Sequence, residues 1–158
     1  NRYDPPQAVG IDRLVNAVTV EKEYGLPACV VDFGTATTFD AIDRGYNYLG
    51  GAIAPGVGIS LDALVSHTAK LPKVDLQLPE HVIGRNTTQA MQSGLLWGYI
   101  AMVEGMVARF RAELGEDLHV IATGGLAALV GSHTASINAI DPWLTLEGLY
   151  LIWERMHP

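Results

Sequence analysis

The sequence predicts an α/β fold in which a three-stranded antiparallel start is joined to parallel strands, with helices packed around the sheet. The stretch 30–40 begins as an apolar, β-branched run, turns at a glycine and returns through strand-like residues, which is typical of a hairpin. A third strand is expected at 46–53, directly before a helix at 58–69. A short apolar strand at 118–122 then runs into a glycine pair and another helix.

Helical periodicity explains most of the remaining chain. Apolar residues recur at three- and four-residue steps after Gly10, and Gly25 with Pro27 ends that helix near residue 24. Asn86 and Gln89 form a capping pair for a long helix that ends near residue 114. Proline-containing residues 71–82 connect the two middle helices, and the last helix is predicted at 145–156.

Small residues form a row along the long helix. Gly94, Gly98, Ala101 and Gly105 follow one another at three- and four-residue steps, which lets another helix approach closely. Hydrophobic residues make up 49% of the chain and charged residues only 17%, so an apolar surface is expected to be covered. We therefore expect a packing seam on this helix, and a homodimer that uses it. The methionines beside the row are expected in the core.

Charge and cysteine content restrict the class of protein. A formal net charge of −7 with only ten Lys and Arg residues argues against a general nucleic-acid binder. The single cysteine, Cys29, excludes an internal disulfide and suits a reducing cytoplasm. No apolar run reaches membrane-spanning length, so we expect neither a membrane nor a nucleic acid as a partner.

The bend of the hairpin carries the first candidate site. Gly34 allows close backbone approach to a ligand, and Thr35 and Thr37 add hydroxyl donors suited to phosphate oxygens. Asp32 fits such a place only as a cation ligand, an orienter of water or a hydrogen-bond anchor. The alternative is a hairpin whose Thr and Asp residues merely cap the turn. The strand–glycine pair–helix order at 123–125 also offers donors to a nucleotide, but it is a weak motif alone.

The first turns of two predicted helices carry further candidates with structural alternatives. Asp12 could cap its helix and meet the positive end of the helix dipole, or it could act as a base beside Arg13 as an anion clamp. Thr87 could simply fill the first turn of the long helix. The residues alone do not choose between these interpretations.

Six motifs occur in one order and span nearly the whole chain: Tyr3 with 10–13, then 32–38, 50–56, 86–94, 123–125 and 141–146. Together they resemble one half of the ribonuclease H-like fold shared by actin, sugar kinases and heat-shock ATPases. Within that superfamily the chain resembles type III pantothenate kinase, also known as the Bvg accessory factor family. The resemblance implies phosphorylation of pantothenate by ATP, the first step of coenzyme A biosynthesis, with Mg²⁺ accompanying the nucleotide.

The resemblance also implies roles for individual residues. Asp12 would be the catalytic base, and Asp32 would bind a monovalent cation, K⁺ or NH₄⁺. ATP would be contacted at the two glycine turns, and pantothenate would be held by the start of the chain and the start of the long helix. The implied ATP-binding residues are Gly34, Thr35, Thr37, Thr123, Gly124 and Gly125, and the implied pantothenate-binding residues are Tyr3, Gly10, Ile11, Asp12, Arg13 and Thr87.

Members of that family begin with another phosphate loop, of the type Asp-x-Gly-Asn-Thr, which this sequence lacks. Residues 1–158 are therefore expected to be the C-terminal, actin-like ATPase domain of a two-domain kinase, with the N-terminal phosphate-loop domain absent from this chain and the fragment alone inactive. Two alternatives stay open: a non-catalytic accessory factor that keeps the nucleotide-binding fold, and another small-molecule kinase of the same superfamily.

Overall fold

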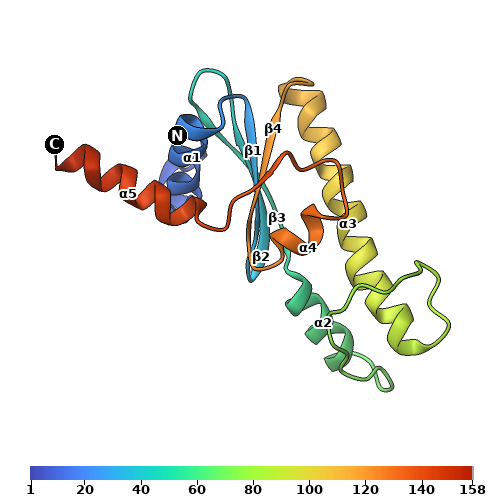
Figure 1. The fold of residues 1–158 in the computed structure, drawn as a ribbon. Helices are drawn as coiled ribbons and strands as arrows, with labels where there is room; N and C mark the ends of the chain where they lie inside the picture. Colours follow the sequence, from blue (N-terminus) through green and yellow to red (C-terminus); the bar gives the residue numbers. More distant parts are fainter. Residues whose placement is uncertain (158) are drawn as a thin grey trace.

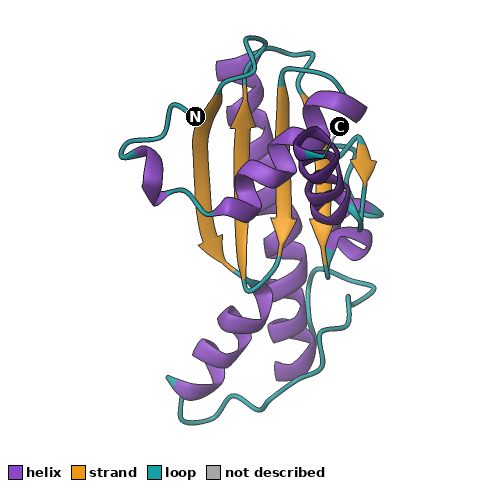
Figure 2. Ribbon diagram, turned by 90° about the vertical axis from the view of Figure 1, so that its left-hand side faces the viewer, coloured by secondary structure: helices purple, strands orange, loops and turns teal. Residues whose placement is uncertain are grey.

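A five-stranded mixed sheet forms the centre of the computed structural model, which describes residues 1–157. The elements in chain order are η1 Pro6–Ala8, α1 Ile11–Glu23, β1 Ala28–Phe33, β2 Ala36–Ile42, β3 Tyr48–Pro55, α2 Val57–Ser66, α3 Thr87–Leu114, β4 His119–Gly124, α4 Ala127–Gly131, β5 Ala139–Ile140 and α5 Leu144–Met156. The strand order is β3-β2-β1-β4-β5 (Figure 2). β1, β2 and β3 pair antiparallel, whereas β4 pairs parallel with β1 and β5, which confirms the predicted mixed sheet.

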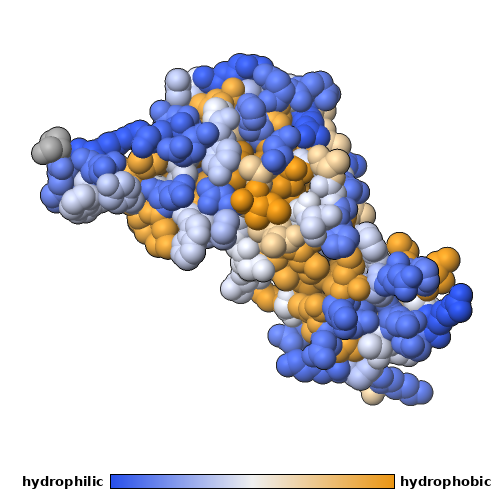
Figure 3. All heavy atoms as spheres, viewed as in Figure 1, coloured by the Kyte–Doolittle hydropathy of each residue, from blue (hydrophilic) through white to orange (hydrophobic). Residues whose placement is uncertain are grey.

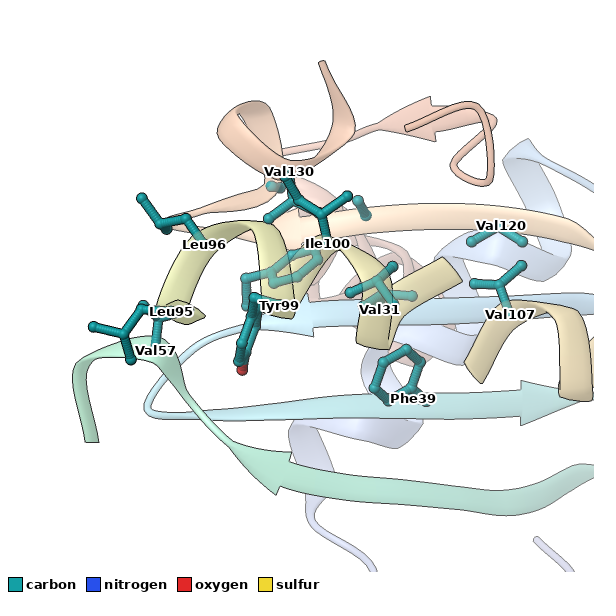
Figure 4. Close-up of a cluster of buried hydrophobic side chains, with 14 of the residues drawn as sticks. Val31, Phe39, Val57, Leu95, Leu96, Tyr99, Ile100, Val107, Val120 and Val130 are labelled. Carbon is teal, nitrogen blue, oxygen red and sulfur yellow. The ribbon is translucent and has the colours of Figure 1, made fainter. Parts of the chain in front are cut away.

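Helices cover both faces of the sheet. α1 and α5 lie on one face and α3 and α4 on the other, while α2 and the start of α3 extend beyond the end of the strands (Figure 1). Neighbouring residues of β1 serve opposite faces: Val30 packs in the cluster beneath α1, and Val31 packs in the cluster beneath α3. Figure 4 shows the second cluster, where Phe39 and Val120 from the sheet lie near Val107 of α3.

Several predicted element ends were wrong by two or three residues, and the start of β3 shows a local reason. β3 begins at Tyr48 rather than at residue 46, because the preceding residues form a tight turn. In that turn the carboxylate of Asp43 accepts hydrogen bonds from the backbone N–H groups of Gly45 and Asn47, and Tyr46 has a φ of 64°. α2 ends at Ser66, three residues before its predicted end.

The strand β5 was not predicted. It contains only Ala139 and Ile140, too few residues to show a periodicity. Its neighbours hold it in place: the side chain of Asn138 accepts from the N–H of Val120 at 2.8 Å, and the N–H of Asp141 donates to the carbonyl of Ala122 at 2.8 Å.

The long helix α3 begins as predicted. The Asn86 side chain accepts from the N–H of Gln89 at 2.9 Å, and the Gln89 side chain accepts from the N–H of Arg85 at 3.0 Å, which confirms the capping pair. Met91 is buried in the core, as expected for the methionines of this helix. Within residues 1–157, no helix is both long and apolar enough to cross a membrane.

The row of small residues on α3 faces outward. Gly94, Gly98 and Ala101 are exposed. A Cβ atom added at Gly94 or at Gly98 would meet no atom within 4 Å. The row therefore does not form a seam with another helix within the described part of this chain.

Candidate functional site

The hairpin bend and the glycine pair lie side by side at the C-terminal ends of two neighbouring inner strands, β1 and β4. Asp32 of β1 is paired with Thr123 of β4, and Phe33 is paired with Gly124. Gly124 has a φ of +88°, and a Cβ there would lie 2.6 Å from Oδ1 of Asp32, so only glycine fits. The N–H of Gly125 donates to the carbonyl of Phe33 at 3.1 Å, which fixes the two turns together.

The hairpin offers fewer phosphate donors than its sequence indicates. The N–H of Gly34 donates to the carbonyl of Ala36 at 3.1 Å and is therefore used within the turn. Thr37 is buried, and its hydroxyl makes a hydrogen bond with the hydroxyl of Tyr99 on α3, so its side chain points into the core. Thr35 is exposed at the bend, and within residues 1–157 its hydroxyl has no hydrogen-bond partner. Thr35 is thus the residue of the hairpin best placed to meet a ligand.

Asp12 lies in the first turn of α1 with an exposed side chain. The residue that precedes the helix, Gly10, has no side chain to cap it, and no side-chain capping hydrogen bond is found at this helix start. Asp12 does not supply such a bond either, although its charge still suits the positive end of the helix dipole. Its carboxylate is therefore available for chemistry.

Three carboxylates face the α1 side of the sheet: Asp12, Asp32 and Asp40. Burial raises the pKa of Asp32, and the negative charges of Asp12 and Asp40 raise it further. A cation beside Asp32 would relieve this repulsion, and carboxylate oxygens are ligands that hard cations prefer. Within residues 1–157, no group of three or more His, Cys, Asp or Glu side chains is placed to hold a metal ion.

Arg13 is 8% exposed, and its side chain contacts residues of the sheet. Its Nε donates to Oδ1 of Asp40 on β2 at 2.5 Å, and the hydroxyl of Tyr48 on β3 donates to the same oxygen at 2.7 Å. The ring of Tyr3 packs against the ring of Tyr48, with centroids 6.3 Å apart. Asp40 and Tyr48 were missed as site residues, although an acid between two apolar residues of a predicted strand is a signal that could have found Asp40.

Thr87 lies apart from the other candidates. It is exposed on the first turn of α3, which projects beyond the sheet, whereas α1 lies across the opposite face (Figures 1 and 2). It lines a hollow of about 730 Å³ between α2 and α3, formed by Leu64, Leu71, Gly84, Arg85, Asn86, Thr87, Ala90, Met91, Gly94 and Leu95. One copy of the chain therefore does not bring Thr87 together with Tyr3 and residues 10–13.

Comparisons with known proteins identify the family of this chain. A family model described as type III pantothenate kinase matches residues 1–109. The type III pantothenate kinase of Moorella thermoacetica is 54% identical over 154 residues, and that of Myxococcus xanthus is 53% identical over 155 residues. Each match covers 98% of this chain but only 61% and 60% of those proteins, so the chain spans about three fifths of their length.

A solved structure supports the fold. A conserved protein assigned to the Baf family of transcriptional activators, from Campylobacter jejuni, superposes with a TM-score of 0.71 at 23% identity. The match covers 95% of this chain and 66% of that one. At this level of identity the likeness shows a shared fold only.

Proposed function

Because this chain belongs to the type III pantothenate kinase family, we propose that the protein phosphorylates pantothenate with ATP, the first step of coenzyme A biosynthesis. The observation that supports it best is the exposed carboxylate of Asp12 on the same sheet face as Asp32, whose pKa is raised partly by the charge of Asp12. We propose further that residues 1–158 are the C-terminal, actin-like domain of a cytoplasmic two-domain kinase. The relatives are longer than this chain, which leaves room for a second domain in the whole protein.

The proposed reaction is direct phosphoryl transfer. Asp12 accepts the proton of the pantothenate hydroxyl while the hydroxyl oxygen attacks the γ-phosphorus of ATP, and ADP leaves with the electron pair of the broken P–O bond. Thr35 and the turn at 123–125 position the nucleotide, and Arg13 binds the pantothenate carboxylate. Mg²⁺ with the nucleotide, and K⁺ or NH₄⁺ beside Asp32, would supply positive charge against the phosphates.

A substrate screen tests this proposal. The full-length protein, supplied with ATP, Mg²⁺ and K⁺, is expected to convert pantothenate to 4′-phosphopantothenate, measured by mass spectrometry and by ADP release. Sugars and acetate serve as control acceptors and are expected to give no product. Phosphorylation of a sugar or acetate but not pantothenate would indicate another kinase of the superfamily. ATP binding without any turnover would favour the non-catalytic accessory factor.

We also propose a homodimer in which the hollow beside Thr87 completes the site of a second copy. The outward row of small residues on α3 and the exposed apolar side chains of Ile53, Ile59 and Leu64 support a partner at this end of the molecule. Figure 3 shows hydrophobic surface, in orange, over the region where α2 and α3 lie. In such a dimer Thr87 of one copy could contact pantothenate held by Asp12 and Arg13 of the other.

Mixing two inactive variants tests this arrangement. Asp12→Asn removes the base, and Thr87→Phe fills the hollow at an exposed helix position that tolerates bulk. Each variant alone is expected to be inactive, whereas co-expressed variants regain activity because each mixed dimer contains one intact site. Light scattering measures the assembly. No recovery of activity in a mixed dimer, or a monomer at micromolar concentration, would contradict the shared site.

A further inference from the structure

Asp40 is a fully buried carboxylate in the middle of an otherwise apolar strand. It lies between Phe39, which packs beneath α3, and Ala41, and its own side chain faces α1. Burying a charge in this way is unfavourable unless the charge is paired and its oxygens are hydrogen-bonded. Burial raises the pKa of Asp40, and hydrogen bonds from Tyr48, Arg13 and Thr38 act against that rise. Three hydrogen-bond donors of the protein are therefore directed at a carboxylate that no ligand could reach.

The contacts around Asp40 restrain the guanidinium of Arg13 to one orientation. Its Nε donates to Oδ1 of Asp40 at 2.5 Å, while the hydroxyl of Thr38 donates to Oδ2 at 3.0 Å. The guanidinium carbon lies 5.8 Å from the centre of the Tyr48 ring, so the aromatic face also restrains the group. Because the guanidinium is planar and rigid, fixing Nε fixes the direction of Nη1 and Nη2 as well.

The far end of the guanidinium is unused. Within residues 1–157, neither Nη1 nor Nη2 of Arg13 donates a hydrogen bond to the protein, and Nη2 is buried without a partner. A buried charged donor without an acceptor is unfavourable, so a built-in acceptor would be expected if Arg13 served the fold alone. A carboxylate oxygen of a ligand is the acceptor that matches this fork.

The same network reaches a second candidate residue. Tyr48, which donates to Asp40 at 2.7 Å, packs against Tyr3, and the N–H of Arg2 donates to the carbonyl of Tyr48 at 2.8 Å. Asp40 thus contacts Arg13 directly and is connected to Tyr3 by way of Tyr48. Arg13 and Tyr3 are both proposed to bind pantothenate.

We infer that Asp40 is a positioning residue for substrate binding: it fixes Arg13 through Nε, so that the unpaired end of the guanidinium is held in place for the carboxylate of pantothenate. This inference rests on the proposed function. Asp40 itself touches no substrate and takes no part in proton transfer. Its loss must therefore weaken pantothenate binding while the phosphoryl-transfer step continues.

The test is Asp40→Asn in the full-length protein. Asparagine keeps one oxygen, which can accept from Tyr48 in the place of Oδ1, and its amide group takes the place of Oδ2 beside Thr38. The substitution removes the charge that holds Arg13. We expect the KM for pantothenate to rise by about 10- to 100-fold, with kcat and the KM for ATP changed by less than about threefold. Binding of pantothenol, the neutral analogue in which a CH₂OH group replaces the carboxylate, should change by less than about threefold.

Two further variants keep the test decisive. Tyr48→Phe removes only the hydroxyl, so it should raise the same KM by about three- to tenfold even if Asp40→Asn folds poorly. Asp43→Asn removes a carboxylate whose partners lie in its own turn, Gly45 and Asn47, and should leave every kinetic constant unchanged.

The outcomes separate the inference from the function on which it rests. An active wild-type protein whose Asp40→Asn and Tyr48→Phe variants keep the KM for pantothenate would overturn the positioning role alone. Equal losses for pantothenate and pantothenol would also overturn it, because a purely structural residue affects both. A wild-type protein that neither binds nor phosphorylates pantothenate would overturn both proposals.

Discussion

Replacing Asp12 with asparagine is expected to lower kcat for pantothenate phosphorylation by about 10²- to 10⁴-fold, the range that a general base contributes. Asparagine keeps the size of the side chain but cannot accept the hydroxyl proton at neutral pH. The KM for ATP should change little, because the nucleotide is assigned to the turns at residues 34–35 and 123–125. Steady-state kinetics of the full-length protein measures both constants.

A helix-dipole role for Asp12 predicts a different result. A first-turn carboxylate contributes about 0.3–1 kcal/mol to stability, so its loss would lower only the melting temperature. Glu147→Gln is the matched control, because Glu147 is an exposed acid in the first turn of α5. Both variants should lose a similar amount of stability, and only Asp12→Asn should lose activity. An Asp12→Asn protein with a normal rate and a lowered melting temperature would refute the base assignment.

The sequence predicted the features that depend on neighbouring residues. The hairpin follows from its turn residues, and the start of α3 follows from the N-cap residue Asn86. The helix after Gly10 follows from the periodicity of its apolar residues. These features required no knowledge of distant contacts.

Residues whose surroundings come from distant parts of the chain were predicted less well. Thr37 was grouped with the hydroxyls of the turn, but β2 begins at Ala36, so Thr37 already belongs to the strand and its side chain enters the core. Arg13 and Asp40 are 27 positions apart, and only the packing of α1 on β2 makes them a pair. The separation of Thr87 from Asp12 follows from the projection of α3 beyond the sheet, which no local pattern reports.

Asp32→Asn is expected to have opposite effects on stability and on activity. A carboxylate about 4 Å from a monovalent cation contributes about 4 kcal/mol of attraction at an effective dielectric constant near 20. Screening by salt at a half-buried site reduces this attraction, so we expect the loss of the carboxylate to weaken cation binding by about a hundredfold. We expect K⁺ to stimulate kcat/KM of the wild-type protein, and the variant should lose this stimulation. Titrating K⁺ against activity at constant ionic strength measures this loss.

Without the cation, the same substitution should stabilise the protein at neutral pH. The pKa of Asp32 is raised in the folded state by burial and by the charges of Asp12 and Asp40, so folding disfavours its ionised form. The stability that Asp32 contributes is present below its unfolded pKa, near 3.9, and is lost as the pH rises through the folded pKa. Thermal unfolding in potassium-free buffer should show a higher melting temperature for Asp32→Asn at pH 7, and the difference should vanish toward pH 3.5.

Asp43→Asn supplies the control of opposite sign. Hydrogen bonds from the backbone N–H and the side chain of Asn47 lower the pKa of Asp43, so its stabilising effect is present above the unfolded pKa and is lost as the pH falls through the folded value. This variant should be less stable than the wild-type protein at pH 7 and should respond normally to K⁺. If Asp32→Asn also lost stability at pH 7, or kept its response to K⁺, Asp32 would be a structural residue and the cation would have to bind elsewhere.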